Sequence, residues 1–219
     1  MIETKLAILW DLDGTIVDTK TCHFESWRDT LKEHGCDLDR DLFEANFGRN
    51  NRTSLPIYLG YTPDKALSKQ IIHEKETHFL KTAPQKAPLV KGVESWLADA
   101  KEANIIQAIA SSADLEGIRS MIFHFNLQQY FEMFISGADL PAKPEPDVFL
   151  QASHVLDPSI ERFIVIEDSP PGVKAAKRAR MTCIAVASGQ PKAALGMADL
   201  VIEDFSSPLM DALRYLGID

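Results

Sequence analysis

Residues 6–15 read Leu6-Ala7-Ile8-Leu9-Trp10-Asp11-Leu12-Asp13-Gly14-Thr15, an apolar run that ends in two carboxylates and a glycine. Five consecutive apolar residues predict a fully buried strand that presents polar groups at its C-terminal end, where open α/β sheets bind their ligands. On an extended strand Asp11 and Asp13 would point to opposite faces, but a turn begun by Gly14 can bring the second carboxylate back toward the first. The pair indicates a site for a divalent cation such as Mg2+, provided that other parts of the chain agree, because Asp-x-Asp-Gly is also a common turn composition.

Length and charge limit the class of protein. A chain of 219 residues can form one large α/β domain, or a core domain that carries a small insertion. Its net charge of −9 argues against a general nucleic-acid or anionic membrane surface, so phosphate recognition would depend on a few lysines, backbone amides and a metal.

The cysteines and the apolar segments bear on the cellular setting. Cys22, Cys36 and Cys183 are far apart and lack Cys-x-x-Cys spacing, which indicates neither a disulfide framework nor a zinc site. We expect a cytoplasmic protein, because the sequence shows neither a secretory leader nor an apolar stretch long enough to span a bilayer. The acidic composition and the lack of a heptad seam predict a monomer.

Apolar runs of strand length recur after about residue 100, and segments with helical periodicity separate them. These runs are Ile105 to Ala110, Met133 to Ser136, Phe163 to Ile166, Cys183 to Ala187 and Asp199 to Ile202. Strands that alternate with helices predict an α/β fold: a doubly wound, Rossmann-like parallel sheet with helices on both faces.

Residues 18–85 have a different pattern, with apolar residues at helical spacing and no convincing strand. We interpret them as an all-helical cap domain inserted after the first strand, so that residues 1–17 and 86–219 form the core domain. Hinges are expected near residues 15–20 and 82–90. The prolines of the stretch Thr82–Pro88 discourage helix and suit the return hinge.

Two further predicted strands lead to groups that could hold a phosphate. Ser111 and Ser112 follow a strand and precede a helix, which is a ready phosphate site, although either serine could simply cap that helix. Lys143 lies between Pro141 and Pro144, which restrict its freedom, and its cation could neutralise a phosphoryl oxygen together with nearby carboxylates.

Acidic residues follow a fourth strand. Glu167 and Asp168 come directly after the apolar run that ends at Ile166, and a Ser-Pro-Pro helix start follows them. They could cap the helix and favour its positive end. Their position at the same sheet edge as Asp11 and Asp13 makes a shared metal the stronger interpretation.

In order and spacing, these four groups of residues resemble the four motifs of the haloacid dehalogenase superfamily of phosphotransferases. The resemblance covers essentially the whole chain, and the helical insertion is similar to the cap of the first subclass. The segments Asp18-Thr19, Lys143–Phe149 and Glu167–Ser169, together with His23, resemble the β-phosphoglucomutase-like branch, which contains both mutases and small phosphatases.

The resemblance implies a Mg2+-dependent phosphatase that hydrolyses a small phosphomonoester, such as a sugar phosphate. Asp11 would be the nucleophile that forms an aspartyl-phosphate, and Asp13 would be the general acid and base. The metal would be held by Asp11, the backbone carbonyl of Asp13, Glu167 and Asp168. The phosphoryl group would be held by Ser111, Ser112, Lys143 and Gly14.

The resemblance further implies that the cap closes over the phosphate site and sets specificity. The candidate residues there are His23, Arg49, Asn51, Arg52 and Lys75. His23 either couples the first motif to the cap or is a partly buried structural histidine. Alignment on the flanking glycine places Asn51 where the mutase has an arginine that clamps a second phosphate, and Arg52 comes one residue later.

Two alternatives remain open at this point. A β-phosphoglucomutase, interconverting β-glucose 1-phosphate and glucose 6-phosphate, would use the same machinery. An acidic cluster with Mg2+ and a lysine also describes a non-enzymatic phosphoacceptor signalling domain, but that module is shorter and has no helical insertion. Asn51, at the position where the mutase has an arginine, favours the hydrolase over the mutase.

Overall fold

The computed structural model describes residues 5–218. In this part of the chain a six-stranded sheet has the order β3-β2-β1-β4-β5-β6, and every neighbouring pair is parallel. Its strands are β1 (Leu6–Trp10), β2 (Ile106–Ser111), β3 (Met133–Ser136), β4 (Arg162–Glu167), β5 (Thr182–Val186) and β6 (Leu200–Ile202). The α/β fold with a doubly wound parallel sheet is therefore confirmed, and each strand lies within a residue or so of its predicted run.

Strand β1 is central because it is apolar on both faces. Ile8 and Trp10 pack into the hydrophobic cluster on one face of the sheet, and Ala7 and Leu9 pack into the cluster on the other. Alternate residues of one strand thus enter two separate cores, which explains the uninterrupted apolar run in the sequence.

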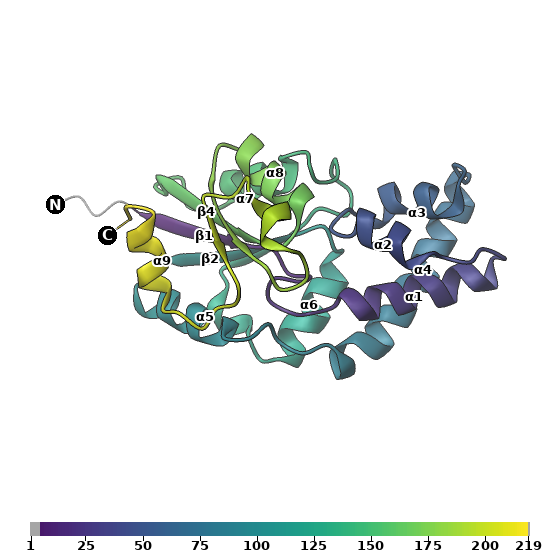
Figure 1. The fold of residues 1–219 in the computed structure, drawn as a ribbon, viewed down its shortest axis with the longest axis horizontal. Helices are drawn as coiled ribbons and strands as arrows, with labels where there is room; N and C mark the ends of the chain where they lie inside the picture. Colours follow the sequence, from purple (N-terminus) through teal and green to yellow (C-terminus); the bar gives the residue numbers. More distant parts are fainter. Residues whose placement is uncertain (1–4, 219) are drawn as a thin grey trace.

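Helices cover both faces of this sheet (Figure 1). Helices α5 (Val93–Glu102), α6 (Leu115–His124) and α9 (Leu209–Tyr215) contribute to the first cluster, and α7 (Asp147–Val155) and α8 (Pro170–Arg178) to the second. Short 3-10 helices span Gln128–Tyr130 and Lys192–Leu195.

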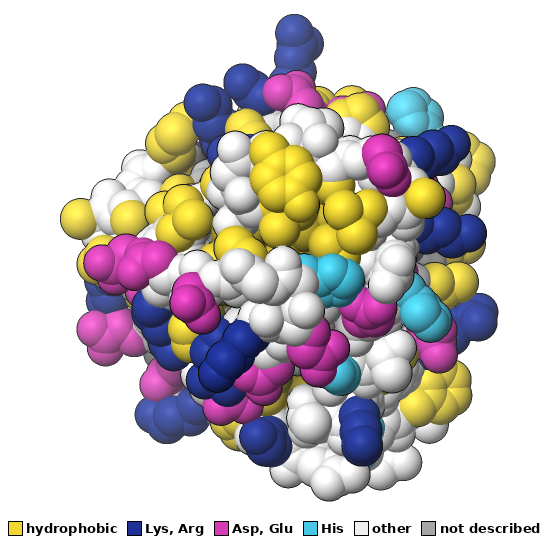
Figure 2. All heavy atoms as spheres, turned by 90° about the vertical axis from the view of Figure 1, so that its right-hand side faces the viewer, with side chains coloured by type: hydrophobic (Ala, Val, Ile, Leu, Met, Phe, Trp, Pro, Cys, Tyr) yellow, Lys and Arg dark blue, Asp and Glu magenta, His cyan; other side chains and the backbone are white. Residues whose placement is uncertain are grey.

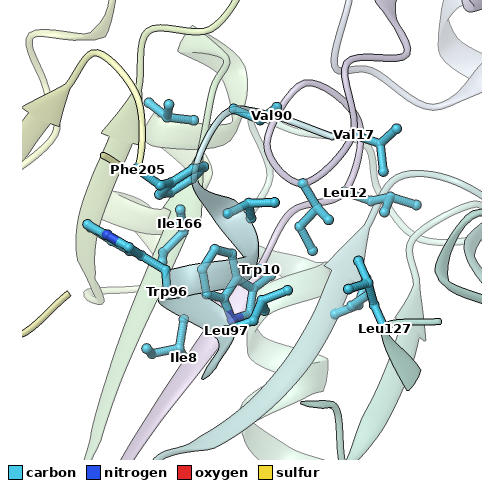
Figure 3. Close-up of a cluster of buried hydrophobic side chains, with 14 of the residues drawn as sticks. Ile8, Trp10, Leu12, Val17, Val90, Trp96, Leu97, Leu127, Ile166 and Phe205 are labelled. Carbon is cyan, nitrogen blue, oxygen red and sulfur yellow. The ribbon is translucent and has the colours of Figure 1, made fainter. Parts of the chain in front are cut away.

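The first cluster is built around large aromatic side chains (Figure 3). The rings of Trp96 and Phe205 meet edge to face with centroids 4.9 Å apart, and Trp10 lies 5.9 Å from Phe205. The indole N–H of Trp10 donates to the side chain of Gln107 at 3.1 Å, so the buried polar atom is satisfied.

The inserted segment forms α1 (Lys20–Glu33), α2 (Arg40–Asn46), α3 (Asn51–Leu59) and α4 (Lys65–Lys86). These helices enclose a hydrophobic cluster of their own that includes Trp27, Phe43 and Ile71. They lie beyond the end of the sheet toward which β1 runs, on the right in Figure 1. Figure 2 shows the outer end of this helical cap, where acidic and basic side chains are interspersed.

We predicted that the prolines of the stretch Thr82–Pro88 discourage helix. For residues 82–86 this prediction is wrong. Helix α4 continues to Lys86 with Pro84 inside it. A proline removes one backbone donor, but Phe79 and Ala83 on the same helix are buried in the core cluster, and their packing holds the last turn in place. The return connection therefore begins at Ala87. The exact division into residues 1–17, 18–85 and 86–219 stays a prediction. No helix of the described residues is long and apolar enough to cross a membrane.

Candidate active site

The loop after β1 positions both carboxylates of the first motif. The amide of Asp11 still donates to the carbonyl of Ile166 at 2.9 Å, so Asp11 extends the strand pairing. Gly14 then adopts a φ of 87°, which L-residues rarely adopt, and its amide donates to Val17 at 2.7 Å. As a result, Asp11 and Asp13 line the same cavity, as the turn at Gly14 predicted.

A lysine and three carboxylates are packed together below this cavity. Nζ of Lys143 lies 2.5 Å from Oδ1 of Asp11 and 2.6 Å from Oε1 of Glu167. Oxygen atoms of Asp11, Glu167 and Asp168 lie within 4.8 Å of one another, and all three residues are buried. Of the four strand ends predicted to share a site, those of β1 and β4 and the segment after β3 meet here, and Ser111 at the end of β2 lines the cavity together with Asp11. Lys143 lies behind Asp11 and does not line the cavity.

This cluster brings three carboxyl groups together with one ammonium group. Burial raises the pKa of Asp11 to about 8, although the ammonium of Lys143 opposes the shift. Burial and the neighbouring Glu167 and Asp11 raise the pKa of Asp168 well above its usual range, while Asp11 and Glu167 outweigh burial and raise that of Lys143. One ammonium does not neutralise three carboxylates, so an additional cation would relieve their repulsion.

The residues present fit a hard divalent cation. The donors are carboxylate oxygens, which suit Mg2+. Glu167 is already committed on one side, because its Oε2 accepts from the amides of Asp168 and Ser169, each at 2.8 Å. Space for the cluster depends on Gly14: a Cβ there would lie 2.2 Å from Oδ2 of Asp168. Asp11 and Asp168 are thus the carboxylates best placed to hold a metal.

Asp13 faces the cap. Its Oδ1 accepts from the hydroxyl of Thr19 at 2.6 Å and lies 3.0 Å from Nε2 of His23. Burial acts to raise its pKa, but His23 and Thr19 outweigh burial and hold the pKa of Asp13 below its usual range. The ring of His23 also stacks on Phe79 at 4.0 Å, so this histidine joins the first motif to the cap.

Ser111 at the end of β2 and Ser112 after it line the cavity, and neither caps the following helix. Asp114 is the N-cap of α6, where its carboxylate accepts from Gly117 at 2.7 Å. The hydroxyl of Ser111 accepts from the amide of Ala113 at 3.1 Å, and the hydroxyl of Ser112 donates to the carbonyl of Gly48 in the cap at 3.1 Å. Gly14 is different: its amide is already engaged by Val17 and it does not line the cavity.

The predicted cap residues separate into two groups. Arg49 and Asn51 line the cavity. Arg52 lies on the exposed rim, where it pairs with Asp139 of the core. Lys75 is fully buried, with Nζ 2.9 Å from Nδ1 of His23, and it does not line the cavity. In this structure the side chains of Arg52 and Lys75 are bound to other residues, and their role in specificity stays a prediction.

Three residues of the site were not singled out as candidates from the sequence. Thr19 binds Asp13, Glu76 lines the cavity beside Lys75, and Asn50 ties the cap to the core. Nδ2 of Asn50 lies 3.1 Å from the carbonyl of Leu140. Oδ1 of Asn50 caps α3 by accepting from the amide of Thr53 at 3.1 Å. The Gly-Arg-Asn-Asn loop and the helix start after it were the available signal for Asn50.

The cavity between cap and core has a volume of about 50 Å³. Its walls come from the first motif, the two serines at the end of β2, the loop before α3 and the inner face of the cap helices. That volume holds a few water molecules and is too small for a sugar phosphate. The structure therefore shows a closed cap, which must move for a substrate of that size to enter.

Comparison with known proteins places this site in a family. The model of the haloacid dehalogenase-like hydrolases matches residues 8–186. The β-phosphoglucomutase of Bacillus subtilis (strain 168) is 31% identical over 216 residues, which cover 95% of this chain and 93% of the relative. A phosphorylated carbohydrates phosphatase of Thermotoga maritima is 29% identical over 177 residues, covering 79% and 81% of the two chains.

A solved structure agrees on the fold. The β-phosphoglucomutase of Clostridium difficile has a TM-score of 0.85 with this chain at 24% identity, covering 99% of this chain and 98% of the other. The chain belongs to the haloacid dehalogenase-like hydrolases and is an enzyme of that family. The resemblance drawn from the four motifs is confirmed.

Proposed function

We propose that the protein is a Mg2+-dependent phosphatase that hydrolyses a sugar phosphate or a similar small phosphomonoester through an aspartyl-phosphate on Asp11. The observation that supports this most strongly is the buried cluster of Asp11, Lys143, Glu167 and Asp168 beside a cavity that the cap closes. Similarity to enzymes named for phosphorylated carbohydrates supports the substrate class.

The chemistry divides into two displacements. A carboxylate oxygen of Asp11 attacks phosphorus, the ester P–O bond breaks, and Asp13 gives a proton to the leaving oxygen. Water then attacks the aspartyl-phosphate and loses a proton to Asp13, which releases inorganic phosphate and restores Asp11. Ser111 and Ser112 line the cavity where the phosphoryl oxygens would lie, and bound Mg2+ would neutralise their charge. The lowered pKa of Asp13 keeps its carboxylate ionised and able to take up a proton in the second step, whereas the first step uses its protonated form.

The test is inorganic phosphate release from a panel of phosphorylated sugars and small metabolites with Mg2+. We expect release from the wild-type protein and no turnover by Asp11→Asn, while Asp18→Asn, a nearby exposed carboxylate, serves as the matched control with wild-type activity. Failure to release phosphate from every ester, or an active Asp11→Asn protein, would overturn the proposal.

A second candidate is β-phosphoglucomutase activity, favoured by the 31% identity to the B. subtilis enzyme and by the closed cavity, which limits access of water. It is tested with β-glucose 1-phosphate and a trace of the bisphosphate. Glucose 6-phosphate that forms without matching phosphate release would establish the mutase, and phosphate release with little glucose 6-phosphate would establish the phosphatase.

A further inference from the structure

Glu76 brings a fixed negative charge to the cap side of the cavity. It lies on α4 and lines the cavity, and only 13% of its side chain is exposed. Two donors hold its Oε1: Nζ of Lys75 at 2.8 Å and Nδ2 of Asn51 at 2.5 Å. Within residues 5–218 no group donates to its Oε2, so this oxygen can accept from a ligand.

The charge of Glu76 is retained in the folded protein. Burial acts to raise its pKa, but Lys75 and His23 outweigh burial and hold the pKa of Glu76 below its usual range. The same negative charge contributes, after burial, to the raised pKa of Asp114 at the start of α6.

Lys75 pairs with Glu76 but does not line the cavity, so a ligand would contact Glu76 and not Lys75. Its ammonium is fully buried and is bound between Glu76 and His23. Arg49 is the lining residue that would attract a second anion, and its buried Nε has no hydrogen-bond partner among the described residues. Arg49 thus offers a donor and Glu76 an acceptor, and the side chains of Asn46 and Asn51 line the same cavity.

Such an array suits hydroxyl groups, each of which both donates and accepts. A second phosphate, as a dianion, can accept hydrogen bonds but cannot donate one. In this confined cavity it would also be repelled by the ionised carboxylate of Glu76.

We propose that Glu76 is a specificity residue that accepts hydrogen bonds from the hydroxyl groups of an uncharged sugar or polyol and excludes substrates that carry a second phosphate. This inference rests on the proposed phosphatase function and narrows it to monophosphates. Lys75 and His23 connect Glu76 to Asp13, so the ratio of kcat/KM between paired substrates, rather than the absolute rate, measures the role of Glu76.

The experiment compares substrates that differ only by the second phosphate. We would measure kcat/KM for phosphate release from fructose 1-phosphate against fructose 1,6-bisphosphate, and from glucose 1-phosphate against glucose 1,6-bisphosphate, with p-nitrophenyl phosphate as an ester without sugar hydroxyls. The wild-type protein is expected to prefer the monophosphate of at least one pair by about tenfold or more, because like charges in a confined site repel.

Glu76→Gln removes the charge and keeps the shape, so it should reduce that preference by about fivefold or more. Glu74→Gln, on the same helix but with its carboxylate paired to His34 at 2.6 Å, is the matched control and should keep the wild-type ratio. Asn51→Arg, which places a cation beside Glu76, should shift the ratio in the same direction as Glu76→Gln and provides the test if Glu76→Gln does not fold.

The possible outcomes distinguish a failure of the Glu76 inference from a failure of the proposed phosphatase function. If both members of every pair are hydrolysed equally by the wild-type protein, or if the ratio is the same in Glu76→Gln and Asn51→Arg as in the wild type, the inference is wrong and the phosphatase function stands. If no ester releases phosphate, p-nitrophenyl phosphate included, the proposed function falls and the inference falls with it.

Discussion

At the scale of single residues, Gly14 is required for two reasons, its backbone conformation and its close approach to Asp168. Its φ of 87° suits glycine, and an added Cβ would lie 2.2 Å from Oδ2 and 2.6 Å from Cγ of Asp168. Because Asp168 is enclosed by other buried groups, it has little room to move away. The glycine thus lets the first and fourth motifs approach each other.

Gly14→Ala should therefore displace Asp168 and lower kcat/KM by about a hundredfold, since a shift of about 1 Å in a catalytic group has an effect of that size. Gly35→Ala is the matched control, because Gly35 has a φ of 73° and no atom within 4 Å of its would-be Cβ. It should lose about 1 kcal/mol of stability through the same backbone strain and keep its activity. Equal activity in the two variants would contradict this role for Gly14.

Which residues the sequence could predict follows from where they lie. Asp11, Ser111 and Asp168 follow apolar strand runs, and in a parallel sheet such positions converge at one edge. Glu76 lies on α4 and Thr19 directly precedes α1, and the polar residues of such helices face solvent, neighbours and ligand alike, so nothing in their spacing distinguishes these two. Their roles depend on how the cap packs against the core, which periodicity does not encode.

At the scale of elements, helix α3 and the loop before it fasten the cap to the core. Nδ2 of Asn50 lies 3.3 Å from the carbonyl of Gly137 and 3.1 Å from that of Leu140, and Asn50 is buried. On the rim, Arg52 forms an exposed ion pair with Asp139. We infer that the buried amide contributes more to closure than the exposed pair, because water competes for the latter.

Asn50→Asp separates closure from helix capping. Aspartate is an equally good N-cap, so α3 should stay formed, but the two core carbonyls lose their donor and face a carboxylate. We expect kcat/KM for the best ester of the panel to fall by about tenfold, which corresponds to about 1.4 kcal/mol. Arg52→Ala should change it by less than about threefold. An Asn50→Asp protein with wild-type kcat/KM would show that these contacts do not stabilise the closed cap.

Helix boundaries were predictable only where local signals and packing agree. Helix α8 begins at the Ser-Pro-Pro sequence, and Ser169 caps it, because a capping serine and prolines in the first turn point the same way. At Pro84 the local signal opposes the helix, but the burial of Ala83 on the same turn prevails. Tertiary packing of this kind is not visible in a single sequence.

At the scale of the whole molecule, the buried acidic cluster should couple metal binding to folding. The native state gathers three carboxylates around one ammonium, whereas the unfolded chain separates them. A cation that binds only the native state adds about 2.7 kcal/mol of stability at a hundred times its Kd.

Mg2+ should accordingly raise the thermal midpoint by roughly 5–10 °C over the protein in EDTA, for a chain of this size. In Asp168→Asn the shift should disappear, while the metal-free variant should be at least as stable as the metal-free wild type, because one of the repelling carboxylates is gone. Thermal unfolding followed by circular dichroism measures both. A wild-type midpoint that does not respond to Mg2+ would contradict a metal site at this cluster.

The proposed reaction depends most on the covalent role of Asp11. The direct measurement is to quench the wild-type protein during turnover of its best ester, digest it, and locate the phosphoryl group by mass spectrometry, with Asp11→Asn treated in parallel. We predict one phosphoryl group on Asp11 in the wild-type protein and none in the variant. A phosphoryl group on a different residue, or full turnover by Asp11→Asn, would contradict the account.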